Sequence, residues 1–79
     1  MVTWDIEVTD TFGGQANYSW VDRYVVRTPG DISDLALVRR IKSVAGYSGI
    51  QGRATVMGVS LEIRFPALRV VIFANARWW

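Results

Sequence analysis

Hydrophobic and polar residues alternate along much of this chain, which is the pattern of β-strands with one buried face. The alternation is clearest over residues 2–9, where every second residue is apolar: Val2, Trp4, Ile6 and Val8. It returns in YSWVDRYVVR, RATVM and SLEIRF, whereas LRVVIFA is a nearly continuous apolar run, typical of a strand at a sheet centre or covered on both faces. These segments predict four to five strands.

The segment YSWVDRYVVR is expected to pair with residues 2–9 as an antiparallel hairpin, so that every second residue lies on the same face of the sheet. On this basis Tyr18, Trp20, Tyr24 and Val26 would share a face. The break TPGD then ends the strand, since proline cannot donate to a ladder.

After this break the apolar spacing changes to that of a helix. Over residues 32–45 the apolar positions gather on one side: Leu35, Leu37, Val38, Ile41, Val44 and Ala45. Asp31 is the predicted N-cap, and Gly46 is the predicted left-handed residue after the helix. The chain therefore predicts an α+β fold of order β-β-α-β-β-β, in which one helix packs on one face of an antiparallel sheet, in a single domain of residues 1–79.

The other face of such a sheet poses a problem, because a helix of about 14 residues spans roughly 21 Å and covers one face only. The predicted uncovered face mixes apolar and basic side chains: Val21, Val25, Val71, Phe73, Arg23, Arg27 and Arg69. Three alternatives could pack on this face: the C-terminal Trp78 and Trp79, a second copy of the chain in a homodimer, or a foreign partner.

Composition restricts the chemistry, because the 79 residues include no cysteine and no histidine. Disulfides, zinc–thiolate sites and the commonest general base are thereby excluded. Asp5 and Glu7 share the outer side of one strand and are interpreted as solvated. We expect no enzyme activity, no cofactor and no metal. No apolar run has the length of a membrane span and no signal peptide is evident, so we expect a soluble cytoplasmic protein without a membrane partner.

The net charge of +2 is unevenly distributed. Residues 1–38 carry six acids and two bases, a net −4, whereas residues 39–79 carry one acid and seven bases, a net +6. The two halves can neutralise each other. Alternatively, the basic residues form a patch that binds phosphates, which would make the protein a small nucleic-acid-binding accessory protein. The candidates for this patch are Arg39, Arg40, Lys42, Arg64 and Arg69.

The segment DTFGGQANYSW, residues 10–20, is predicted as a glycine-rich loop of about eight residues. A structural role, in which its aromatic residues pack at the sheet edge, and a role in recognition both remain open. It lacks the lysine and third glycine of phosphate-binding loops. If the segment binds a partner, the contact residues would be Phe12, Gln15, Asn17, Tyr18 and Trp20, together with the terminal Trp78 and Trp79.

The stretch VTDTFGGQANYSWV resembles a segment of small proteins encoded by bacteriophages and other mobile elements of bacteria, in which D-T-F-G-G-x-A-N-Y-x-W recurs. The likeness extends over residues 6–50 and departs at Gln15, where an acid is expected, and at Asp22, where a base is expected. The resemblance implies a role: a non-enzymatic inhibitor of a host defence complex, as anti-CRISPR proteins are, that binds a host protein or ribonucleoprotein in the bacterial cytoplasm. It identifies no contact residue.

Overall fold

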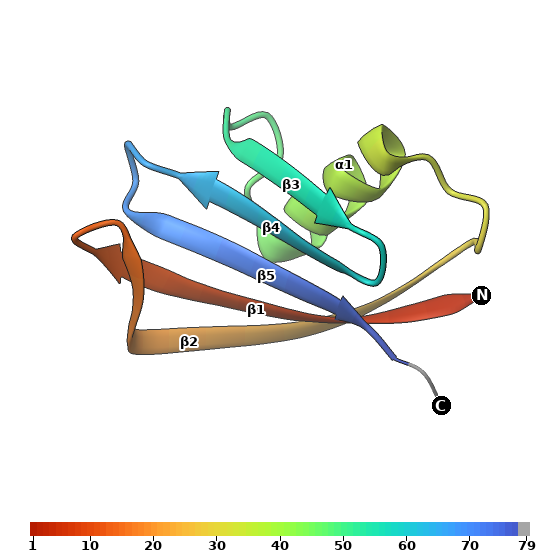
Figure 1. The fold of residues 1–79 in the computed structure, drawn as a ribbon, viewed down its shortest axis with the longest axis horizontal. Helices are drawn as coiled ribbons and strands as arrows, with labels where there is room; N and C mark the ends of the chain where they lie inside the picture. Colours follow the sequence, from red (N-terminus) through yellow and green to blue (C-terminus); the bar gives the residue numbers. More distant parts are fainter. Residues whose placement is uncertain (78–79) are drawn as a thin grey trace.

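The computed structural model describes residues 1–77, whose strands form an antiparallel sheet in the order β2-β1-β5-β4-β3, with a helix against one face (Figure 1). Along this part of the chain the elements are β1 (Val2–Phe12), β2 (Gln15–Thr28), α1 (Asp34–Ala45), β3 (Arg53–Met57), β4 (Ser60–Phe65) and β5 (Val70–Ala76). The predicted α+β fold and its β-β-α-β-β-β order are confirmed.

The apolar run near the C-terminus forms the central strand, β5, which pairs with β1 on one side and β4 on the other. This agrees with the prediction, but β5 begins and ends two residues later than expected. Residues 66–69 form a turn instead, in which the amides of Leu68 and Arg69 donate to the carbonyls of Phe65 and Pro66. Residues 75 and 76, expected in a tail, pair with β1.

Helix α1 begins later than predicted, and the predicted N-cap is wrong. Ser33 is the N-cap, because its backbone is extended and its hydroxyl accepts the amide of Ala36 at 3.2 Å, so Asp31 lies outside the helix. The predicted C-terminal end is confirmed: Gly46 is left-handed, with a φ of 87°, and the amide of Tyr47 donates to the carbonyl of Lys42 at 2.8 Å.

The core lies between α1 and the sheet. Leu37, Ile41 and Ala45 are the buried residues of the helix, and they pack on the apolar side chains that β1, β2, β4 and β5 direct to that face: Trp4, Ile6, Val8, Val26, Leu61, Ile63, Phe65, Val70, Ile72 and Ala74. The indole nitrogen of Trp4 is satisfied within the core, donating to the hydroxyl of Thr28 at 3.1 Å. The helix thus buries one complete face of the sheet's central strands.

Two substitutions on the same helix test this arrangement. Ile41 has no exposed surface, so Ile41→Ala is expected to lower the free energy of unfolding by about 2–5 kcal/mol through lost burial and a cavity. Leu35 is 62% exposed, and Leu35→Ala should cost less than about 0.5 kcal/mol. Urea unfolding of both variants measures the difference, and equal effects would contradict the assigned helix orientation.

Candidate functional site: the glycine hairpin and the uncovered sheet face

The predicted loop of about eight residues is wrong, because β1 and β2 continue to a turn of only two residues, Gly13 and Gly14. Their φ angles are 61° and 82°, and Phe12 pairs with Gln15 across the turn. Positive φ at both central positions matches the right-handed twist of the flanking strands, and glycine adopts it without steric cost. The glycine pair is therefore explained by the hairpin itself.

The carboxylate of Asp10 holds the two arms of this hairpin together. It accepts the side-chain amide of Asn17 at 2.9 Å, and the backbone amide and hydroxyl of Ser19 at 2.9 and 2.6 Å. These donors favour the charged carboxylate and, led by the Ser19 hydroxyl, lower the pKa of Asp10 to about 2. Asn17, a predicted partner contact, thus has a structural role.

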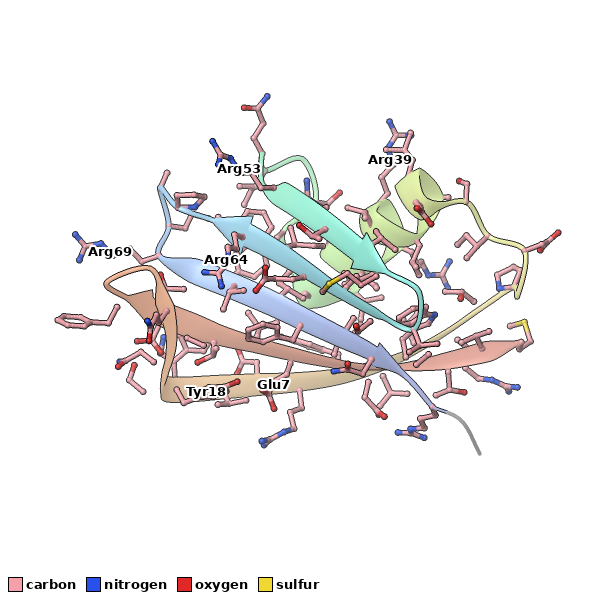
Figure 2. The ribbon with its side chains drawn as sticks, in the orientation of Figure 1. Glu7, Tyr18, Arg39, Arg53, Arg64 and Arg69 are labelled. Atoms are coloured by element: carbon pink, nitrogen blue, oxygen red, sulfur yellow. The ribbon has the colours of Figure 1, made fainter. Side chains whose placement is uncertain are left out.

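The hairpin is also bent, which changes the face on which Tyr18 lies. The β1–β2 register shifts between Thr9 and Thr11, and Tyr18 has a positive φ of 56°. Tyr18 consequently lies beside Glu7 (Figure 2), on the face opposite α1, and not with Tyr24 and Val26 as strict alternation predicts. Burial, followed by the Glu7 carboxylate, raises the pKa of Tyr18.

The face not covered by α1 is occupied by ion pairs. Within residues 1–77 these join Arg23 to Glu7 at 3.4 Å, Arg64 to Glu62 at 2.9 Å, and Arg77 to Asp5 at 2.6 Å. The Arg77 guanidinium lowers the pKa of Asp5. Glu7 and Glu62 flank the half-buried Phe73 in register across three strands. The predicted apolar and basic mixture is present on this face in part, because Val71 is fully buried and Arg69 lies in the β4–β5 turn. Acids from β1 and β4 pair with arginines that remain on this face.

Arg64 connects this face to the hairpin. Besides its ion pair with Glu62, its guanidinium donates to the carbonyl of Gly14 at 2.6 Å, across 50 residues of sequence. The glycine turn is therefore fastened to β4, and Arg64 makes two internal contacts that a free phosphate-binding arginine would not have.

The structure does not gather the five predicted basic residues into one patch. Arg39 and Arg40 are exposed on α1, and Lys42 lies 5.9 Å from the centre of the Phe65 ring. Arg64 lies on the opposite face of the sheet, and Arg69 lies in the β4–β5 turn, far from Arg39 (Figure 2). This separation does not favour the alternative of a phosphate-binding patch.

Among the predicted partner contacts, Phe12 is the most exposed at 78%, followed by Tyr18 at 52% and Trp20 at 39%. Gln15 is exposed beside the turn. Trp78 and Trp79 lie outside the described residues. The hairpin end therefore brings Phe12, Gln15 and Tyr18 to the surface, while Asn17 serves the Asp10 contacts.

The sequence analysis missed the contribution of the β4–β5 turn. Thr11, Phe12, Gly13, Gly14, Pro66 and Arg69 line a shallow pocket of about 440 Å³ between this turn and the hairpin. The β4–β5 turn lies next to the hairpin because β1 pairs with β5. The residues of the turn, 66–69, contain no sequence pattern that predicts this pairing.

A second surface depression lies between α1 and the edge strand β3, at a distance from the hairpin. Its volume is about 540 Å³, and its lining combines apolar and charged residues: Leu35, Val38, Ala54, Val56, Asp34, Arg39 and Lys42.

Compared with known proteins, the chain matches no family, no curated protein and no solved structure. Among residues 1–77, no group of three or more acidic side chains is placed to hold a metal ion. No helix in the described part of the chain is long and apolar enough to cross a membrane.

The Asp10 contacts predict a specific pH dependence. Because folding lowers this pKa from 3.8 to about 2, the ionised carboxylate stabilises the fold above pH 3.8, and this contribution is lost as the pH falls through about 2. The urea midpoint of the natural protein should therefore exceed that of Asp10→Asn near neutral pH, and the gap should close over that window. Asp31→Asn controls for loss of an exposed carboxylate. A gap that persists below pH 2 would contradict the assignment.

Proposed function

We propose that this protein is a non-enzymatic phage or mobile-element protein that inhibits a host defence complex by direct binding, in the manner of anti-CRISPR proteins. The resemblance of residues 6–50 to small phage-encoded proteins supports an origin in a phage or mobile element. The composition supports the absence of catalysis, because carboxylates, one lysine and hydroxyls are the remaining acid–base groups.

The observation that carries the binding role is the exposure of Phe12 at a braced hairpin end. Several neighbours in the DTFGGQANYSW segment have structural explanations: the glycines form the turn, and Asn17 and Ser19 donate hydrogen bonds to Asp10. Phe12 makes no comparable contribution, since 78% of its surface is in water. An aromatic side chain on a rigid support loses little conformational entropy on binding, which is characteristic of interface hot spots.

Binding there would inhibit by occlusion. The hairpin projects at one end of the sheet (Figure 1), so it can enter a recess on a larger complex while the rest of the protein blocks access to that recess. The internal contacts of Arg64 and Asp10 keep the turn in its bound shape before contact.

Phage plaquing tests this function. The protein is expressed in bacterial hosts that each carry an active CRISPR–Cas system of a different type, and each host is infected with a phage that the system targets. We expect plaquing efficiency to rise by orders of magnitude in at least one host. Unchanged plaquing in every host, with the protein detected in the cells, would contradict the proposal.

Phe12→Ala is the matching variant test. Because Phe12 is exposed, the substitution should leave the urea midpoint unchanged while it reduces plaquing and weakens affinity for the inhibited complex at least about tenfold. Leu35→Ala removes a comparably exposed apolar side chain from α1 and should retain full inhibition. Loss of inhibition with Leu35→Ala alone would instead place the contact in the α1–β3 depression.

A further inference from the structure

The β4–β5 turn and the β1–β2 hairpin form one continuous surface, because they are bonded to each other. The amide of Thr11 donates to the carbonyl of Arg69 at 2.8 Å, directly beyond the β1–β5 pair of Asp10 and Val70. The amides of Leu68 and Arg69 close the turn at 3.0 and 3.3 Å. A molecule that contacts the hairpin end therefore meets both turns in a fixed relative position.

This surface, hereafter the two-turn surface, consists of Phe12, Gly13, Gly14, Pro66, Leu68 and Arg69. Its pocket lies between Phe12 and Arg69, and Leu68, beside Arg69 in the turn, is 47% exposed. Two large apolar side chains thus stand in water next to a guanidinium. Such a combination, an apolar contact beside an arginine, is enriched where proteins bind one another.

The backbone at this end of the molecule is strained. Within residues 1–77, Tyr18 and Arg69 are the non-glycine residues with positive φ, at 56° and 55°. Both lie at the hairpin end of the sheet, and left-handed backbone of this kind costs free energy that the surroundings must offset.

The charge available on the two-turn surface is positive. Arg69 forms no ion pair within residues 1–77, whereas the nearby Arg64 is neutralised by Glu62. The nearest acid of the hairpin, Asp10, accepts hydrogen bonds from Asn17 and Ser19 and is internally engaged. The two-turn surface therefore presents to a partner the Arg69 guanidinium, which has no ion pair within residues 1–77, and the exposed apolar side chains of Phe12 and Leu68.

We propose that the two-turn surface binds an acidic segment of a protein partner, with a partner carboxylate on the Arg69 guanidinium and an apolar partner side chain in the pocket that Phe12 and Pro66 line. This inference rests on the proposed function and specifies the chemistry of the surface that the inhibitor recognises. Guanidinium and carboxylate form paired, charge-assisted hydrogen bonds, which fix orientation as well as adding affinity.

The same surface suits a protein better than a nucleic acid. Phosphate-driven binding needs several unpaired cations along one track, because affinity grows with the number of phosphates neutralised. Arg69 is the basic residue that lines this pocket, and Phe12, Pro66 and Gly14 form most of its wall. Arg53 lines an adjoining depression beyond Pro66, and Arg64 is paired with Glu62. Within residues 1–77 this end of the molecule therefore offers two guanidinium groups without an ion pair, fewer than a phosphate-binding track needs.

Charge reversal tests the proposal. With the purified complex that the plaquing assay identifies as the probe, Arg69→Glu is expected to weaken binding at least tenfold, and Arg69→Lys, which keeps the charge and loses the planar fork, less than that. Arg40→Glu, on the exposed side of α1, controls for the change in net charge and should bind within twofold of the natural protein. Urea midpoints establish that each variant is folded.

The outcomes separate this inference from the proposed function. If Phe12→Ala weakens binding while Arg69→Glu behaves as Arg40→Glu does, the acidic-partner inference is overturned and the inhibitory function stands. If the protein relieves no defence system, the function itself fails. Binding of a 20-nucleotide single-stranded DNA or RNA that is lost in Arg69→Glu would overturn the inference in favour of nucleic acid.

Photo-crosslinking provides a second measurement that needs no identified partner. p-Benzoylphenylalanine is placed at position 68 in the two-turn surface, or at position 35 on α1 as the control, and the protein is irradiated in host cells during infection. We expect crosslinked peptides from position 68 to carry several carboxylates within a few residues of the crosslink. Neutral or basic peptides, nucleic acid, or crosslinks from position 35 alone would overturn the inference.

Discussion

A short helix can bury only one side of a sheet, and the rest of this structure follows from that limit. Helix α1 has 12 residues and is about 18 Å long, and it covers one face of the sheet with Leu37, Ile41 and Ala45. The opposite side must then be made compatible with water by other means. Glu7, Glu62 and Asp5 pair with arginines there, which leaves Phe73 half-buried among charges. Exposed ion pairs of this kind contribute little stability, but they solvate an otherwise apolar layer.

The hairpin is organised by polar contacts because it extends beyond the area that the helix covers. Three donors on Asp10 and the Arg64 contact to Gly14 replace the burial that fixes the other strands. Residues 10–20 therefore include two kinds of residue. Asp10, the glycine pair, Asn17 and Ser19 specify the shape of the hairpin, and Phe12 is displayed by it.

The fold was predictable from sequence because its signals are local. Alternation identified the strands, the helical period identified α1, and Gly46 marked the helix end. The N-cap was missed because Asp31 and Ser33 are both good caps, and Asp31 lies inside a turn that the Ile32 amide closes on the Pro29 carbonyl at 3.3 Å. The tight turn was missed because the strands continue through residues 10–12 and 15–18, which have little apolar alternation. The proximity of Arg69 to Phe12, and the left-handed backbone of Tyr18, depend on strand pairing between distant segments and have no sequence signature.

The edge strand β3 has a consequence for behaviour at high concentration. Its outer side has no neighbouring strand in the sheet order, its length is 5 residues, and Ala54, Thr55 and Met57 are exposed. Arg53 supplies its charge. An unprotected edge of this kind is a template for lateral growth, in which copies polymerise strand by strand. The shortness of β3 and the repulsion between the Arg53 side chains of neighbouring copies oppose such polymerisation.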